Sequence, residues 1–484
     1  MSESQRSLTE RIAYSGISYV IVTLSGFLGT IYLARVLGAS ALGVFALGLG
    51  IIKWLRIADL GVNSAIEKRV SEGTNRGEHL SAGLIIQSTL ATVVVVGMLA
   101  FRGQINTYVG KQLAWIIGLL FVTDYLLKGF VVQAIRGCQR VHITEGMKAI
   151  EQVLRVLFQV TLVVVGYGVF SLFAGMALSL VTIALLGIGY TVRYTDLSFA
   201  MPSRRQFRSL YDFSKYSVIG NIKSQVFAWL DILILGFFVV DAQIGIYNVA
   251  WTLAMSFVLM GYAIRSNFFP EISSIATEGN NTRVSELFSE GLLYSGLLPI
   301  PGCVGAFLLG SSVLNIYGHE FQSGATVLVL LLLASFLRSY DAIVSSVLYG
   351  IDRPDLGFKM TVTFLVVNVG LNVALIPVFG IAGAAIATIA AIGASLVIGW
   401  WLLKTAIEIT LPTWEVGKQV LAALVMGVVI AAVKQFLIPD RIMHLLIVIS
   451  LGGTVYFGVL LSISTPLREK ALTIVEELPV TYLF

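Results

Sequence analysis

The sequence predicts an all-α, polytopic membrane protein with about fourteen transmembrane helices. The first observation is composition: 57% of the 484 residues are hydrophobic and only 12% are charged, and the mean hydropathy is +0.89. A soluble domain with so few charges could not cover its own surface, so most side chains must face lipid. The second observation is spacing, because the apolar residues fall into stretches of roughly 20, the length that spans a bilayer.

Each apolar stretch is bounded by polar or turn-forming residues, and these boundaries place the spans. The first stretch runs to Leu37, which is too long for the apolar region of a signal peptide, so we expect a retained first span. The expected spans are 14–37, 40–58, 79–101, 113–136, 150–168, 170–193, 213–240, 244–270, 286–311, 323–350, 357–378, 381–403, 415–437 and 441–463.

The basic residues predict how the chain is oriented, since Lys and Arg favour cytoplasmic loops. With the N-terminus inside, 24 of the 32 Lys and Arg residues fall in or beside inside segments, five fall outside and three lie within spans. Both termini are therefore expected on the cytoplasmic side of the membrane. The membrane itself is expected to be the cell (plasma or inner) membrane. The same bias explains the net charge of +5 without a nucleic-acid partner.

The spacing of the connections predicts an internal repeat. We expect an N-terminal lobe at 1–193, a cytoplasmic linker at 194–212, a C-terminal lobe at 213–404, and two further spans with a tail at 405–484. Shifting the chain by 202 residues places Gly43 on Gly245, and shifting it by 213 places Gly137 on Gly350. Six spans separate the copies, so the repeat is parallel and its pseudo-twofold axis is expected along the membrane normal.

Catalytic and metal-binding patterns are absent from the sequence. The two cysteines lie in different halves and the four histidines are scattered, so neither a disulfide framework nor a metal site is expected. Gly110-Lys111 and Gly417-Lys418 are each followed by Gln, which excludes a phosphate-binding loop of the GxxxxGK[ST] type. No loop is large enough for a catalytic domain. We expect a non-enzyme without a cofactor.

Six ionisable residues lie well inside the predicted spans, where each charge costs on the order of 3 kcal/mol. They are Asp124, Lys128, Lys223, Asp231, Arg338 and Asp341. Their spacing puts Asp124 with Lys128, and Arg338 with Asp341, on shared helix faces. One interpretation is a hydrated cavity between the lobes that binds substrate, to which Asn221 would contribute beside Asp231. The alternative is a set of structural ion pairs that hold helices together.

A second polar group lies toward the cytoplasmic ends of the second and eighth spans. It comprises Lys53, Arg56, Asp59 and Arg265. These residues either extend the cavity or are ordinary basic side chains that reach the interface. In the eleventh span, Asn368 and Asn372 lie one turn apart and precede a turn and a small-residue helix face, for which helix packing is the expected role.

Several segments together resemble the polysaccharide transport (Wzx-like) group of the multidrug/oligosaccharidyl-lipid/polysaccharide superfamily, and they cover nearly the whole chain. The resembling segments are Leu33-Ala34-Arg35 with Leu37-Gly38 and Leu42-Gly43, Asp59-Leu60-Gly61, Arg136-Gly137, Asp231 with Gly236, Gly245 and Tyr247, Pro270-Glu271, Asn368, Leu371-Asn372, Ile376-Pro377, Gly380-Ile381 and Gly383-Ala384-Ala385-Ile386-Ala387-Thr388.

The resemblance implies a flippase that carries a lipid-linked oligosaccharide, on an isoprenoid phosphate or diphosphate, from the cytoplasmic to the outer leaflet by alternating access. Its partners would be this substrate and membrane lipid, and we expect it to work as a monomer. The depth of Asp231 and Asp124 in their spans separately suggests that one of them carries a coupling proton or Na⁺. Because the mid-membrane charges balance, a cationic cavity would draw on Arg35, Lys53, Arg56 and Arg265. The alternatives are a multidrug or cation antiporter, a lipid II flippase, or a membrane-embedded glycan polymerase or ligase.

Overall fold

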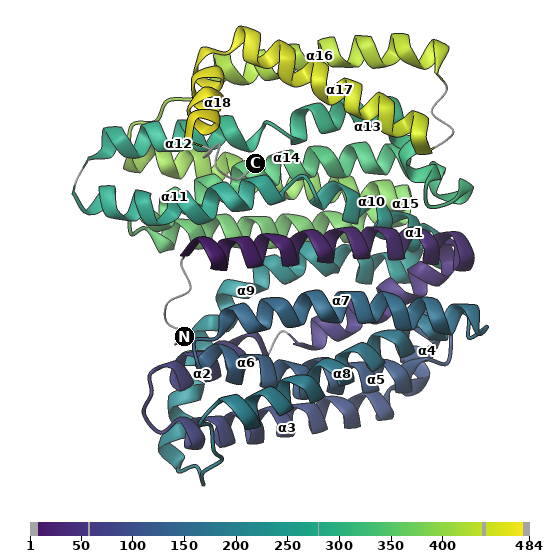
Figure 1. Cartoon of the computed structure of the whole chain (residues 1–484), viewed down its shortest axis with the longest axis vertical. Coiled ribbons are helices and arrows are strands. Elements are labelled where there is room, and N and C mark those ends of the chain that lie inside the picture. Colours follow the sequence, from purple (N-terminus) through teal and green to yellow (C-terminus); the bar gives the residue numbers. More distant parts are fainter. Residues whose placement is uncertain (1–7, 57–58, 279, 438–441, 478–484) are drawn as a thin grey trace, which may run out of the picture. The chain divides into compact units, whose positions relative to one another are not determined.

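The computed structural model describes residues 8–56, 59–278, 280–437 and 442–477. Within these ranges the side chains of residues 8–20, 59–60, 216–221, 259–260, 262–267 and 474–477 are left undescribed. Every regular element in the described ranges is a helix (Figure 1). The chain divides into two compact units, Met1–Gly245 and Ile246–Phe484.

The first unit contains nine α-helices and one π-helix, and begins the tenth α-helix. They are α1 (Leu8–Leu55), α2 (Asp59–Ser71), α3 (Arg76–Ala100), α4 (Arg102–Val109), α5 (Ala114–Val122), η3 (Thr123–Gly129), α6 (Phe130–Gly137), α7 (Val141–Val164), α8 (Phe170–Tyr194), α9 (Arg204–Phe238) and the start of α10 (Asp241–Met255). Ser203 and Gln206 cap the start of α9 reciprocally, an arrangement that satisfies free backbone N–H groups of the first turn.

One glycine separates the first two expected spans inside α1. Gly38 has φ 81° and ψ 172°, so the helix breaks there. A residue with a Cβ atom rarely adopts this backbone conformation, because the side chain would clash with the chain itself. Gly38 therefore allows one continuous segment to supply two spans.

Apolar spacing on α2 builds the core of the first unit. Val62, Ile66 and Val70 recur at helical intervals and are buried, with Phe130 of α6 and Leu210 of α9 in the same cluster. Elsewhere in this unit α7 and α8 pack side by side, and α1 packs against α7. The first unit is thus packed around several adjacent helix pairs.

The second unit contains most of α10 and the helices that follow. They are α11 (Leu259–Thr277), α12 (Asn281–Ser295), α13 (Pro299–Asn315), the 3-10 helix η4 (His319–Gly324), α14 (Ala325–Gly350), α15 (Pro354–Ala406), α16 (Thr413–Phe436), α17 (Ile442–Ile463) and α18 (Thr465–Glu477). Gly380, with φ 55° and ψ −133°, breaks α15 as Gly38 breaks α1.

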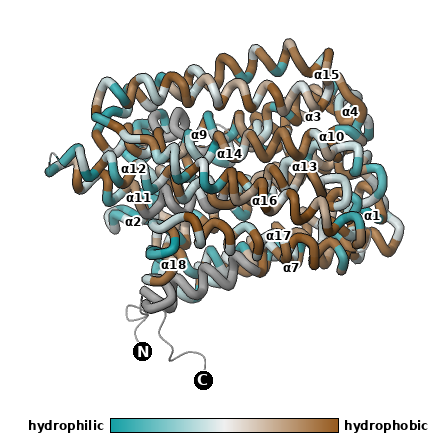
Figure 2. The backbone as a smooth tube through the Cα atoms, turned by 90° about the horizontal axis from the view of Figure 1, so that it is seen from above, coloured by the Kyte–Doolittle hydropathy of each residue, from teal (hydrophilic) through white to brown (hydrophobic). Residues whose placement is uncertain are grey.

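Two apolar clusters hold the second unit together. Phe288 of α12, Val347 of α14 and Met360 of α15 belong to the first cluster. Met426 of α16 and Tyr456 of α17 belong to the second, which joins these two adjacent helices to α13 (Figure 1). Figure 2 shows α13, α16 and α17 as predominantly hydrophobic.

The described helices confirm the predicted all-α polytopic membrane fold. Nine helices are long and apolar enough to cross a membrane among the described residues, and α1 and α15 each contain two expected spans. Eleven of the fourteen expected spans are thereby covered. The other three correspond to α7, α9 and the pair α10–α11, which carry more charged residues or fall partly on undescribed side chains.

One pair of helix boundaries recurs along the chain at an offset close to that of the predicted repeat. In the first unit α1 ends at Leu55 and α2 begins at Asp59; α10 ends at Met255 and α11 begins at Leu259. Both boundaries are thus offset by 200 residues. The six, six and two division of the spans stays a prediction, because α9 packs with α1, α2 and α3 inside the first unit.

Candidate functional site

The fourth expected span is irregular where its charges occur. It consists of α5, η3 and α6, and the π-helical segment Thr123–Gly129 contains both Asp124 and Lys128. Short π-helical segments are rare inside α-helices and frequently mark functional sites. This irregular segment places the Asp124 carboxylate against the end of α1.

Three cations converge on the Asp124 carboxylate, which is 3% exposed. Lys53 Nζ donates to Asp124 Oδ2 at 3.0 Å, and Arg56 Nη1 donates to the same oxygen. Lys128 Nζ lies 3.6 Å from Asp124 Oδ1. The structure therefore brings Lys53 and Arg56 together with the Asp124–Lys128 pair, which sequence spacing alone had identified.

The network continues onto α7. Lys128 Nζ lies 2.8 Å from Glu151 Oε2, and Arg155, one turn further along α7, donates to Gln152 Oε1. We call Lys53, Arg56, Asp124, Lys128, Glu151 and Arg155 the cationic cluster. It holds four basic and two acidic side chains, so its local formal charge is +2 and not zero.

Glu151 and Arg155 were not among the predicted site residues. The expected fifth span began at 150, which made both look like residues near a span end, whereas α7 begins at Val141. Their spacing of four, acid first, repeats that of Asp124 and Lys128. That repeated pattern was the available signal.

The cationic cluster is partly open, whereas the predicted pair in the second unit is closed. Lys53 and Lys128 are 28% and 23% exposed, against 8% for Arg338 and 2% for Asp341. Arg338 Nη1 donates to Asp341 Oδ2 at 3.0 Å. Ser395 Oγ donates to Asp341 Oδ1 at 2.7 Å, so this pair joins α14 to α15.

Three further predicted site residues have described side chains. Lys223 and Asp231 are buried in α9, and Arg35 is exposed on α1 just before Gly38. The side chains of Asn221 and Arg265 lie outside the described part of the structure.

The polar residues of α15 support the packing role expected for this segment. Asn368 Nδ2 lies 3.5 Å from Thr388 Oγ1, so the two halves of α15 contact each other across the break at Gly380. A Cβ atom on Gly383 would lie 2.4 Å from the carbonyl oxygen of Leu375. Such close approach of two helical segments in lipid requires small residues.

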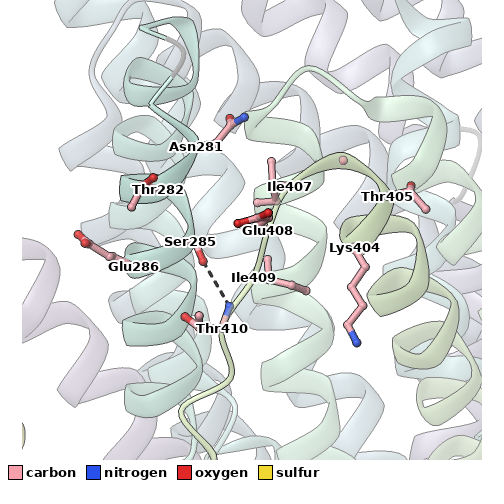
Figure 3. A pocket seen from close by; sticks show the side chains of 11 residues that line it. Asn281, Thr282, Ser285, Glu286, Lys404, Thr405, Ile407, Glu408, Ile409 and Thr410 are labelled. Atoms are coloured by element: carbon pink, nitrogen blue, oxygen red, sulfur yellow. Dashed lines mark hydrogen bonds between the residues drawn. The ribbon is translucent and has the colours of Figure 1, made fainter.

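A cavity of about 1010 Å³ lies in the second unit, between the start of α12 and the segment that follows α15 (Figure 3). Its lining residues are Asn281, Thr282, Ser285, Glu286 and the stretch 404–410. The backbone N–H of Thr410 donates to Ser285 Oγ at 3.3 Å (Figure 3). Both lining segments were predicted as cytoplasmic connections, and none of the predicted site residues lines this cavity.

A second, apolar groove of about 330 Å³ lies deeper in the second unit. It is formed by α10, α13, α14, α16 and α17. Pro301, Gly302 and Gly305 line one side, and Gly452 and Phe457 line another. Apolar walls of this kind accept hydrocarbon and offer nothing to a charged group.

Within the described residues, no group of three or more His, Cys, Asp or Glu side chains is arranged to hold a metal ion. Cys138 and Cys303 are both free thiols. Together, the fold and the site define a multi-pass α-helical membrane protein with a partly open cationic cluster inside one helical unit.

The chain belongs to the polysaccharide biosynthesis protein family, whose model matches residues 8–276. It is 32% identical to the "Probable flippase AglR" of Haloferax volcanii over 463 residues, which cover 95% of this chain and 96% of that one. It is 30% identical to the "Probable low-salt glycan biosynthesis flippase Agl15" of the same organism over 470 residues, or 95% and 98% of the two chains. The resemblance to the polysaccharide transport group is confirmed.

A solved structure of the lipid II flippase MurJ, in an inward closed conformation, has the same fold. The match has a TM-score of 0.77 at 16% identity and covers 92% of this chain and 97% of that one. At this identity the similarity establishes the fold alone.

Proposed function

We propose that this protein is a flippase that moves a lipid-linked oligosaccharide, carried on an isoprenoid phosphate or diphosphate, from the cytoplasmic to the outer leaflet. The glycan would serve cell-surface polysaccharide or glycoconjugate biosynthesis. Membership of the polysaccharide biosynthesis family and two relatives named as flippases support this function. The transport step needs no covalent chemistry, and we propose that the protein is not an enzyme.

The observation that carries the proposal is the convergence of Lys53, Arg56 and Lys128 on one carboxylate inside a membrane-spanning unit. Partly buried basic side chains with only partial neutralisation form strong charge-assisted hydrogen bonds to phosphate oxygens. An uncharged or cationic drug would gain nothing from such a cluster. The site therefore fits the phosphate-bearing head of the substrate.

The apolar part of the substrate has different requirements. An isoprenoid chain can remain in lipid or in an apolar groove, because it needs only hydrocarbon contact. The groove lined by Gly302, Gly452 and Phe457 offers such contact. In this proposal only the sugar-phosphate head needs a polar route through the protein.

The distribution of Lys and Arg among the loops supports an orientation of the chain in the membrane. We propose that both termini are cytoplasmic, that the two lobes comprise six spans each, and that α16 and α17 are additions to the second lobe. Lys53 and Arg56 then lie in the cytoplasmic half of the membrane, where substrate enters. We further propose that the protein works as a monomer, with each chain carrying a complete cationic cluster.

Energy for directional transport could come from an ion gradient. Moving one charge through 100 mV releases about 2.3 kcal/mol, which is enough to bias a flip. We propose Asp231 or Asp124 as the residue that carries a proton or Na⁺. Asp231 is 3% exposed in α9. Ion-dependent transport that is unchanged in Asp231→Asn would exclude Asp231 as the carrier.

Reconstitution tests the function directly. The purified protein would be placed in liposomes with a fluorescent isoprenyl-diphosphate oligosaccharide, and loss of fluorescence to a membrane-impermeant quencher would report transbilayer movement. We expect flipping that depends on the phosphate and falls with Lys53→Gln. Flipping confined to lipid II would favour the lipid II flippase, drug–ion exchange would favour the antiporter, and lengthening of the glycan would favour a polymerase or ligase.

A further inference from the structure

The three cations that contact Asp124 raise the question of how the site remains stable when it is empty. Buried cations without a counter-charge are costly, and breaking a buried pair typically costs several kcal/mol. An ionised carboxylate accepts hydrogen bonds at about four lone-pair positions on two oxygens. Asp124 uses both oxygens, Oδ2 for Lys53 and Arg56 and Oδ1 for Lys128. A phosphate group that bound Lys53 and Arg56 would compete with Asp124 for the same N–H donors.

We propose that Asp124 is an internal counter-ion that the phosphate group of the substrate displaces from Lys53 and Arg56. The proposal rests on the flippase function and assigns Asp124 a role that the family relationship does not specify. In the empty protein Asp124 pairs with Lys53 and Arg56. On loading, the substrate phosphate takes over the two cations, and on release Asp124 recovers them.

The contacts of Lys128 make this exchange possible without leaving Asp124 unpaired. Lys128 Nζ is 2.8 Å from Glu151 and 3.6 Å from Asp124. It can therefore move toward Asp124 when Lys53 and Arg56 turn to the phosphate. Glu151 in turn lies one helical turn from Arg155. Every acid in the cluster has a second basic neighbour.

The backbone of this segment also favours a carboxylate that can change partners. Asp124 and Lys128 both lie in the π-helical segment Thr123–Gly129, and such segments are local distortions that helices use at functional positions. The Arg338–Asp341 pair provides the contrast. It lies in the regular helix α14, and its acid accepts hydrogen bonds from Arg338 and from the Ser395 hydroxyl.

An exchangeable counter-ion weakens substrate binding and speeds substrate release, because the substrate phosphate must compete with Asp124 for the same cations. Removing the competitor should therefore tighten binding and slow transport. A structural role for Asp124 predicts the opposite sign for binding, because loss of the carboxylate would disorganise the cations. The direction of the change in Kd separates the two roles.

The experiment compares wild type with Asp124→Asn in detergent micelles, with farnesyl diphosphate as the probe and titration calorimetry as the readout. We expect the Kd to fall roughly tenfold, the effect of one hydrogen bond to a charged group. Glu145→Gln is the matched control. Glu145 Oε1 also accepts from two cations, Arg136 at 3.1 Å and Lys148 at 2.8 Å, within the same unit. Its Kd should equal that of wild type.

A second pair of variants covers the case in which Asp124→Asn does not fold. The first is Lys128→Gln, which has one cation fewer than wild type. The second is the double variant Asp124→Asn/Lys128→Gln, which loses one cation and one anion and so keeps the net charge of wild type. We expect the double variant to bind farnesyl diphosphate more tightly than Lys128→Gln and to flip the oligosaccharide more slowly.

A Kd that rises or stays constant on removing Asp124 in either background overturns the counter-ion role and leaves the flippase function intact. If the wild-type protein binds no farnesyl diphosphate and flips no isoprenyl-diphosphate oligosaccharide, the proposed function fails, and the counter-ion role fails with it.

Discussion

Lys53 and Asp124 are 71 residues apart in the chain, yet Lys53 Nζ donates to Asp124 Oδ2 at 3.0 Å. The contact joins the last turn of α1 to the π-helical segment η3. Neither side chain is exposed beyond 28%, so the pair is partly shielded from bulk water. Coulomb interactions in such surroundings are stronger than at an exposed surface.

Lys53→Gln should lower the rate of flipping about tenfold, because one charge-assisted hydrogen bond to the substrate phosphate is lost. Lys53→Arg keeps the charge and should retain most of the activity. The quencher assay in liposomes gives both rates. Equal losses in the two variants would show that the shape of the lysine matters and its charge does not.

The two parts of the cationic cluster differ in how readily the sequence predicts them. Asp124 and Lys128 were predicted because their spacing of four puts both on one helix face, a local property. Lys53 and Arg56 were predicted as a second polar group that could extend the cavity, without a link to Asp124. Their contact with Asp124 depends on how α1, η3 and α7 pack, and sequence spacing within one helix carries no such information.

The fold was more predictable than the site, because each span is a local apolar pattern. Predicted ends agree closely for α8, whose bounds Phe170–Tyr194 match the expected 170–193. For α7 the start at Val141 precedes the predicted 150. The segment 141–149 is helical but carries charged and polar side chains on one side. Because the spans were predicted from hydropathy, the predicted start fell after this segment.

Accessibility should differ between the two predicted charge pairs. In a background with Cys138 and Cys303 replaced by Ser, single cysteines at positions 53 and 128 should react with a membrane-impermeant maleimide, because Lys53 and Lys128 are partly exposed. Single cysteines at positions 338 and 341 should not, since Arg338 and Asp341 are buried. Mass spectrometry of the labelled protein gives the extent of reaction.

The control for this labelling is reaction after denaturation in dodecyl sulfate, which should modify all four cysteines equally. Rapid reaction at position 341 in the folded protein would contradict the closed structure of the Arg338–Asp341 pair and place it beside water.

Asp341→Asn should destabilise the second unit. The variant removes the carboxylate that pairs with the buried guanidinium of Arg338, and breaking a buried ion pair costs about 3–5 kcal/mol. Ser395→Ala removes only the hydroxyl that donates to Asp341 and should cost about 1 kcal/mol. Thermal unfolding in detergent, followed by intrinsic fluorescence, ranks the two. A smaller loss for Asp341→Asn than for Ser395→Ala would contradict the ion pair as the main stabilising contact.

Gly43→Ala should impair packing within the first unit. A Cβ atom on Gly43 would lie 1.8 Å from the carbonyl oxygen of Asp241, and one on Gly245 would lie 2.0 Å from that of Ala39. These two glycines are the pair that the 202-residue shift aligns. We expect lower thermal stability and slower flipping for Gly43→Ala.

The control for Gly43→Ala is Gly97→Ala in α3, where an added Cβ atom meets nothing within 4 Å. That substitution should raise stability by up to about 1 kcal/mol, because alanine favours the helix. Equal effects of the two substitutions on thermal stability would contradict the close contact between Gly43 and the backbone of Asp241.

Gly380→Ala should destabilise the protein through its backbone. With φ 55° and ψ −133°, Gly380 adopts a conformation that essentially only glycine tolerates, and the strain on alanine is about 1–3 kcal/mol. Gly393→Ala, in the regular part of the same helix with open space around its Cβ position, should be neutral or stabilising. Thermal unfolding of both variants measures the difference. If Gly380→Ala were as stable as Gly393→Ala, residue 380 would not need the positive φ angle. The helix break at Gly380 would then be contradicted.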